Sequence, residues 1–142
     1  MKLRRGWAMA LAAGMGAAHA CPGLDVRDAW VREAPPGADV MAAYATLENR
    51  GARPLEIDGV GGADFAAAAL HETVLKDGVA HMAHGRPIRL LPQRSVRLEP
   101  GGMHIMLFQP RRALKVGDRA TLSLQCGASR RSFDFVVKTG QE

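Results

Sequence analysis

The sequence predicts an all-β fold, arranged as a β-sandwich or β-barrel. Short segments rich in β-branched or alternating apolar and polar residues recur at a spacing of about ten residues, which is typical of such folds. Gly, Pro and Asp residues separate these segments. The chain beyond residue 20 has about 122 residues, which is enough for one domain with a hydrophobic core. We therefore expect residues 21–142 to form a single β-domain.

Residues 1–20 have the features of a secretory signal peptide. Lys2, Arg4 and Arg5 precede an apolar run over residues 7–18, and Ala18-His19-Ala20 forms a small-x-small cleavage site. The apolar run covers about 12 residues, whereas a membrane-spanning helix needs about 20. We expect an exported, periplasmic protein without stable membrane insertion.

Part of the positive charge of the chain lies in this leader. The formal net charge is +5, from 19 Lys and Arg residues against 14 Asp and Glu residues. Three of the basic residues and none of the acidic ones precede residue 21, which leaves 16 against 14, a net charge of +2. The Arg residues are scattered and few aromatic residues accompany them, so a solvated surface is predicted rather than nucleic-acid binding.

Cys21 and Cys126 are the two cysteines of the chain. In an oxidising compartment two cysteines most simply form one disulfide. Two other roles stay open on the sequence alone: a lipid anchor on Cys21, which cleavage after Ala20 would make the first residue, and a metal ligand at Cys126.

Nine segments are candidate strands, and turn-forming residues separate them. Pro35-Pro36-Gly37 and Asn49-Arg50-Gly51 follow the first two, while Pro100-Gly101-Gly102 and Val116-Gly117-Asp118 flank the seventh. The candidate strands are residues 26–33, 41–49, 55–60, 70–75, 79–83, 95–98, 104–108, 120–126 and 132–138.

The last two candidate strands show the clearest alternation of apolar residues. Their predicted core residues are Leu122, Leu124, Cys126, Phe133, Phe135 and Val137. Trp30 and Tyr44, on the first two candidate strands, are also expected in the core.

Residues 64–72 fit two structures. Asp64 is a candidate N-cap and four consecutive alanines follow it closely, which would suit a short helix. We expect instead a loop that runs into a strand.

Lys76-Asp77-Gly78-Val79 predicts a two-residue hairpin turn, because Asp-Gly supplies the positive φ angles that a type I′ turn requires. This register places Thr73 opposite Met82 and His71 opposite His84. Side chains alternate between faces along a strand, so these four residues project from one face and His81 projects from the other.

His71, Met82, His104 and Met106 are the candidate metal ligands, separated in turn by ten, twenty-one and one residues. Thioether sulfur suits Cu(I), and imidazole suits copper in either oxidation state. Met82 is diagonal to His71 in the predicted hairpin, at about 7–8 Å between backbones, and His104 and Met106 share one face of a strand. His84 is a candidate extra ligand, particularly for Cu(II). Met103 faces away from His104 and is expected to pack in the core or at its rim.

These residues resemble the periplasmic copper chaperones of the PCu(A)C family, whose signature is His, ten residues, Met, twenty-one residues, His-x-Met. The resemblance covers most of the chain after the leader. The further matching segments are Ala29-Trp30-Val31-Arg32, Pro35-Pro36-Gly37, Ala43-Tyr44-Ala45-Thr46-Leu47-Glu48-Asn49, His71-Glu72, Asp77-Gly78-Val79, Leu98-Glu99-Pro100-Gly101-Gly102 and Leu114-Lys115-Val116-Gly117-Asp118.

The resemblance implies a cupredoxin-like Greek-key β-barrel that binds one Cu(I) through two histidines and two methionines. It also implies delivery of the copper to the copper-centre subunit of cytochrome c oxidase or to another periplasmic copper protein. The chain departs from relatives that carry a further Met two residues after the first His, because Thr73 stands there, and from those with Met-Lys-Met where this chain has Ala80-His81-Met82.

On the sequence alone, two other functions compete with that of a copper chaperone. A periplasmic copper buffer for metal tolerance would use the same site without a dedicated acceptor. An electron-transfer cupredoxin would need a Cys thiolate beside two histidines, and no His lies near Cys126 in the sequence. No acid–base pair or substrate pocket suggests an enzyme, and we expect a monomer.

Overall fold

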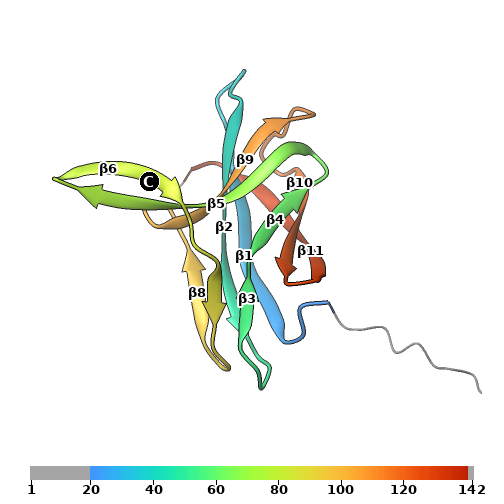
Figure 1. Cartoon of the computed structure of the whole chain (residues 1–142). Helices are drawn as coiled ribbons and strands as arrows, with labels where there is room; N and C mark the ends of the chain where they lie inside the picture. The colour runs from blue at the N-terminus through green and yellow to red at the C-terminus, as the bar shows by residue number, and fades with distance from the viewer. Residues whose placement is uncertain (1–19, 141–142) are drawn as a thin grey trace, which may run out of the picture.

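The computed structural model describes residues 20–140, so the predicted leader lies outside the described residues apart from Ala20. Within this range the chain forms strands and no helix, which confirms the all-β prediction (Figure 1). The strands are β1 (Leu24–Arg32), β2 (Val40–Asn49), β3 (Leu55–Ile57), β4 (Gly59–Gly62), β5 (Phe65–Lys76), β6 (Val79–His84), β7 (Ile88–Leu90), β8 (Ser95–Leu98), β9 (Met103–Pro110), β10 (Arg119–Cys126) and β11 (Ser129–Lys138). The described part accordingly contains no helix that could cross a membrane.

Nine of the strands form one mixed sheet in the order β4-β10-β11-β1-β2-β9-β5-β6, with β8 also paired to β2. Strands β1 and β11 are parallel, and the other pairs of this sheet are antiparallel. β4 at one end of this order leads directly into β5 near the other end. The two ends of the sheet therefore come together, and the sheet curls around the core (Figure 1). β3 and β7 form a separate two-stranded sheet.

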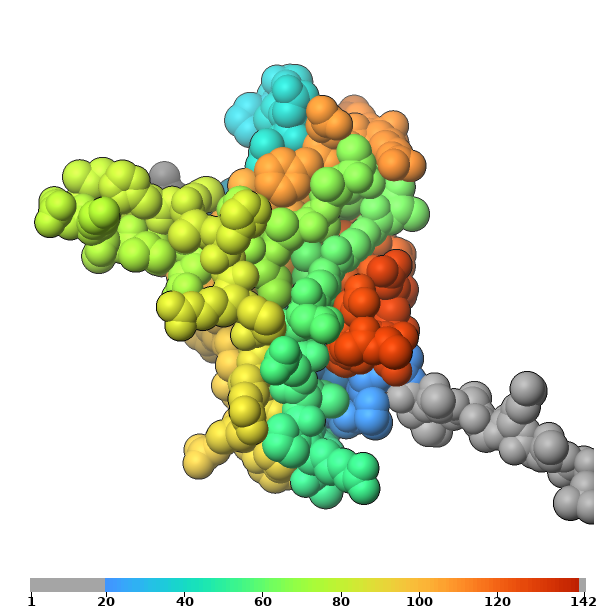
Figure 2. All heavy atoms as spheres, in the orientation of Figure 1, coloured from blue at the N-terminus to red at the C-terminus, as the bar shows by residue number. Residues whose placement is uncertain are grey.

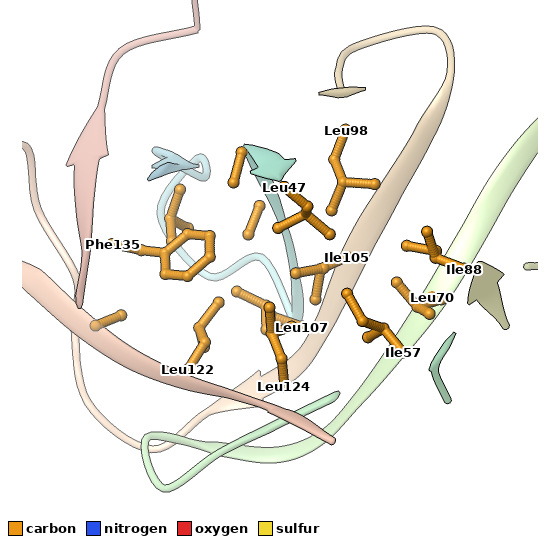
Figure 3. Close-up of a cluster of buried hydrophobic side chains, with 14 of the residues drawn as sticks. Leu47, Ile57, Leu70, Ile88, Leu98, Ile105, Leu107, Leu122, Leu124 and Phe135 are labelled. Atoms are coloured by element: carbon orange, nitrogen blue, oxygen red, sulfur yellow. The ribbon is translucent and has the colours of Figure 1, made fainter. Parts of the chain in front are cut away.

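Aliphatic side chains from most of the strands fill the space inside the curled sheet (Figure 3). The alternation predicted for the last two strands is confirmed, because Leu122, Leu124, Phe135 and Val137 are fully buried and Phe133 and Cys126 pack against them. Met103 also packs against this core, as expected.

Three segments differ from the strands predicted for them. Residues 55–60 divide at Asp58 into β3 and β4, which pair with different partners. The short strand β7 was missed, since Pro87 and Pro92 enclose only a few residues there. The segment expected to begin as a loop is already strand β5 from Phe65, because the alanines pair with β9 and this tertiary pairing overrides their helix propensity.

A β-bulge in β1 turns Trp30 to the outside of the sheet, where it meets Tyr44 of β2. The β1–β2 register shifts between Arg27 and Trp30, and Asp28 adopts a φ of 52° there. Beyond the bulge Val31 and Ala43 face the core, so their neighbours Trp30 and Tyr44 face outward. The expectation that both residues anchor the core was wrong for Trp30, because a bulge turns the following side chains to the other face. Tyr44 is buried at 5% exposure, but it packs on the outer face against Trp30 and His104.

The β5–β6 hairpin has the predicted register, with His71 opposite His84 and Thr73 opposite Met82. Asp77 and Gly78 have φ angles of 53° and 77°, as a type I′ turn requires. The hairpin projects from the body of the protein (Figure 2, yellow-green), and every residue of β6 is exposed.

Cys21 and Cys126 form the expected disulfide, which joins a residue three positions before β1 to the last residue of β10. Both cysteines of the chain are thereby used. The sulfur that a lipid anchor on Cys21 would need, and the sulfur that Cys126 would need as a metal ligand, are therefore both engaged.

Removing the disulfide is expected to destabilise the fold. The bond closes a loop across a sequence separation of 105, and chain-entropy reasoning gives a contribution of up to about 4 kcal/mol for such a loop. The double variant Cys21→Ser/Cys126→Ser should unfold at lower urea concentration than the wild type, and the wild type in reductant should behave like the variant. Equal midpoints for the oxidised wild type and the variant would contradict this role.

Candidate metal centre

Three histidines lie side by side on the outer face of the sheet, on three neighbouring strands. His71 on β5 is opposite His104 on β9 and opposite His84 on β6. The centroid of the His71 ring is 5.0 Å from that of His84 and 6.1 Å from that of His104. His71 is the central member of this histidine row.

Two outward-facing aromatic residues continue the row across the sheet. The Tyr44 ring on β2 lies 6.3 Å from His104, and the Trp30 ring on β1 lies 4.7 Å from Tyr44, between centroids. The Phe108 ring, four residues after His104 on β9, lies 6.0 Å from the His71 ring between centroids. These rings exclude water from one side of the histidine row, and His104 is only 3% exposed.

A backbone contact orients the His104 ring. Its Nδ1 lies 2.9 Å from the carbonyl oxygen of Gly102, which can only accept a hydrogen bond, so Nδ1 carries the proton. In the neutral imidazole this leaves a lone pair on Nε2, and Nε2 is buried without a hydrogen-bond partner. A carbonyl that holds the remote ring nitrogen in this way is the usual outer support of a metal-binding histidine.

His71 has no such partner for either nitrogen: its Nδ1 and Nε2 are both buried and make no hydrogen bond. Buried polar atoms are normally paired, because an unpaired one costs the desolvation of that group. His71 and His104, on adjacent strands, therefore each have an imidazole lone pair free for a Lewis acid that would bind between the two rings.

The two methionines lie on the same face, on opposite sides of the histidine row. Met106 on β9 pairs with Ala69, two residues before His71, and is half-buried. Met82 on β6 pairs with Thr73, two residues after His71, and is 63% exposed. Each is thus a diagonal neighbour of His71, a relation in which backbones are about 7–8 Å apart.

The histidine row does not by itself form a metal site built only from His, Cys, Asp and Glu side chains. Within residues 20–140, no three His, Cys, Asp or Glu side chains are arranged to hold a metal ion. His81 lies opposite Val74 on the other face of the hairpin, as predicted.

The sequence did not indicate the Gly102 carbonyl, Trp30 or Tyr44 as neighbours of the site. Of these, Gly102 was recognisable in principle because it lies two residues before His104.

Burial lowers the pKa of His71 below its usual value, and the neighbouring imidazoles of His84 and then His104 lower it further when they are protonated. A lowered pKa keeps this imidazole neutral, the form that can bind a metal, to lower pH.

The structure can be compared with solved structures. It resembles the copper-bound PCuAC domain from PmoF2, with a TM-score of 0.69 at 24% identity over 86% of this chain and 97% of that one. It also resembles CuI-DR1885 from Deinococcus radiodurans, with a TM-score of 0.67 at 28% identity over 92% of this chain and 88% of that one. Apo-DR1885 gives a TM-score of 0.66 at 26% identity over 99% and 95%. These neighbours define the class of the protein: a β-domain with the cupredoxin-like PCuAC fold.

Residues 24–135 match the family described as "Putative lipoprotein LpqE-like". The chain belongs to this LpqE-like family of PCuAC proteins, which confirms the resemblance to the copper chaperones. A curated relative from Leifsonia xyli subsp. xyli, described as a "Putative lipoprotein", is 32% identical over 104 residues, or 72% of this chain. The match covers 61% of the length of that relative.

The lowered pKa of His71 can be measured directly. In an NMR titration of the ring protons of the metal-free protein, His71 should titrate below about 6.5, the value of a free imidazole. In the variant His84→Ala one repelling neighbour is gone, so the pKa of His71 should rise toward that value. The variant His81→Ala removes an imidazole from the other face of the same strand and should leave it unchanged.

The same shift affects stability. Because the folded-state pKa of His71 is lowered, the unfolded state binds more protons as the pH falls below about 6.5, and this group destabilises the metal-free fold there. A His71 pKa at or above the free-imidazole value would contradict both expectations.

Proposed function

We propose that the protein is a copper chaperone that binds one Cu(I) through His71, Met82, His104 and Met106. The observation that carries this proposal is the pair of neighbouring histidines His71 and His104, whose metal-binding nitrogens are buried without hydrogen-bond partners, with two thioethers on the same face. The copper-bound PCuAC domain from PmoF2 and CuI-DR1885 share its fold and support the choice of metal.

The donor set suits Cu(I) chemically. Thioethers are soft donors that favour Cu(I), and imidazole binds copper in both oxidation states. None of the four donors is anionic, so none of them neutralises the charge of the bound ion. A hard divalent cation such as Mg²⁺ prefers oxygen ligands, which this donor set does not contain. His104 would bind through Nε2, because Gly102 holds the proton on Nδ1.

Differences in exposure suggest an order for copper release. Met82 is 63% exposed on the projecting hairpin, whereas His104 is 3% exposed against Tyr44. An acceptor would reach the copper from the Met82 side and replace that thioether first. His104 would be the last ligand to leave.

The proposed acceptor is the copper-centre subunit of cytochrome c oxidase or another periplasmic copper protein. The relatives described as lipoproteins support an exported location. The protein would act as a carrier and not as an enzyme. An electron-transfer cupredoxin is disfavoured, because the disulfide uses both cysteines and a blue copper centre needs a thiolate.

Replacing both proposed thioether ligands should weaken Cu(I) binding. Met→Leu substitutions keep the volume and remove the sulfur. In anaerobic competition with a Cu(I) chelator, the wild type should bind one equivalent, and Met82→Leu/Met106→Leu should bind at least about tenfold more weakly, a loss of about 1.4 kcal/mol or more. Met103→Leu is the matched control, because Met103 lies on the same strand but faces the core. Wild-type affinity in the double variant would refute the site.

Copper transfer distinguishes a chaperone from a buffer. The Cu(I)-loaded protein should pass copper to an apo oxidase copper-centre domain, detected by the absorption spectrum of the acceptor once its centre assembles. A protein that binds Cu(I) tightly and transfers none would be a copper buffer for metal tolerance.

A further inference from the structure

Strand β6 carries two copper donors on the same face as the proposed site. Met82 and His84 are separated by one residue, so both project toward the side of the sheet that carries His71. The other three proposed ligands, His71, His104 and Met106, belong to β5 and β9 in the body of the sheet. β6 therefore supplies the remaining ligand of a four-coordinate site, and it offers two side chains for that position.

The two side chains approach from different directions. His84 is directly opposite His71 and its ring is edge-on to the His71 ring, at 5.0 Å between centroids. Met82 lies one pleat further toward the tip of the hairpin, on the side of the histidine row away from Met106. His84 is thus the nearer of the two to the centre of the site, and Met82 is the nearer to the exposed turn of the hairpin.

A backbone hydrogen bond anchors the chain directly after His84. Gly85, the next residue, donates its N–H to the carbonyl oxygen of Leu70 at 2.8 Å, which fixes the end of β6 against β5. A Cβ at Gly85 would lie 3.2 Å from that same backbone, so the close approach favours glycine. Met82 lies between this anchor and the exposed turn at Asp77-Gly78.

A hollow opens beside His84. It has a volume of about 280 Å³, and Asp58, Ala69, His84 and Gly85 are among the residues that line it. Cu(II) favours nitrogen and oxygen donors in tetragonal geometry, whereas Cu(I) accepts thioether. The other three proposed ligands do not line this hollow, so the preference of Cu(II) for His84 rests on its donor chemistry.

We infer that the oxidation state of the copper selects the ligand from β6: Met82 completes the site for Cu(I), and His84 completes it for Cu(II). This inference rests on the proposed function, because it uses the same His71, His104 and Met106. No electron transfer by the protein is involved. The chain offers both donors, and the ion supplied determines which one binds.

The test compares Met82→Leu, His84→Ala and the control His81→Ala, each loaded separately with Cu(I) and Cu(II). His81 lies between the two donors on β6 but faces the other side. Cu(I) affinity is measured by anaerobic chelator competition. Cu(II) affinity is measured by competition with a Cu(II) chelator, and the number of bound nitrogens is read from the electron paramagnetic resonance spectrum and its nitrogen couplings.

His84→Ala should lose one nitrogen coupling and weaken Cu(II) binding by about tenfold or more, while its Cu(I) affinity stays within about twofold of the wild type. Met82→Leu should weaken Cu(I) binding and leave the Cu(II) spectrum unchanged. His81→Ala should match the wild type in both assays.

Two results would overturn the inference and leave the proposed function intact. One is an unchanged Cu(II) spectrum and affinity in His84→Ala. The other is an equal loss of Cu(I) and Cu(II) affinity in that variant, which would make His84 a constant ligand. Failure of the wild type to bind Cu(I) would instead refute the proposed function itself.

Discussion

The antiparallel pairing of β5 with β9 is the constraint on which the candidate site depends. It places His71 directly opposite His104 and brings Met106 to the diagonal position. A slip of one residue in this register would turn the whole set on one strand to the other face. The long β5 makes this possible, because it pairs with β9 along its first part and with β6 along its last part. The same strand thus joins the rigid body of the sheet to the projecting hairpin.

Packing in the core stabilises the β5–β9 register, and the proposed ligands on the outer face depend on that register. Ile105 and Leu107 are fully buried on the inner face of β9, where they pack among residues of several strands. The intervening positions on the outer face carry His104, Met106 and Phe108. Because apolar burial determines which face of β9 turns inward, it also determines which side chains line the site. The copper ligands therefore take their orientation from packing on the opposite side of the sheet.

Local signals in the sequence predicted those parts of the structure that depend on neighbouring residues. Asp77-Gly78 sets the turn and hence the pairing of Thr73 with Met82, and the alternation around Leu122 and Phe135 was correct. Features set by distant partners were not predicted: the bulge at Asp28 that turns Trp30 outward, the pairing of β3 with β7, and the early start of β5 against β9. The approach of His71 to His104 was implied by the family resemblance and not by local signals, because it comes from a long-range pairing that ligand spacing does not reveal. The hydrogen bond from His104 to Gly102 likewise depends on how the strand begins.

Strand β6 is an edge of the large sheet, and one side of its backbone has no neighbouring strand in the described structure. Such an edge can template pairing with another chain, and this risk grows with the length and flatness of the strand. β6 is six residues long and is followed at once by Gly85, Arg86 and Pro87, and proline cannot donate to a ladder. The exposure that lets a partner reach Met82 is therefore confined to a stretch too short to favour edge-to-edge aggregation.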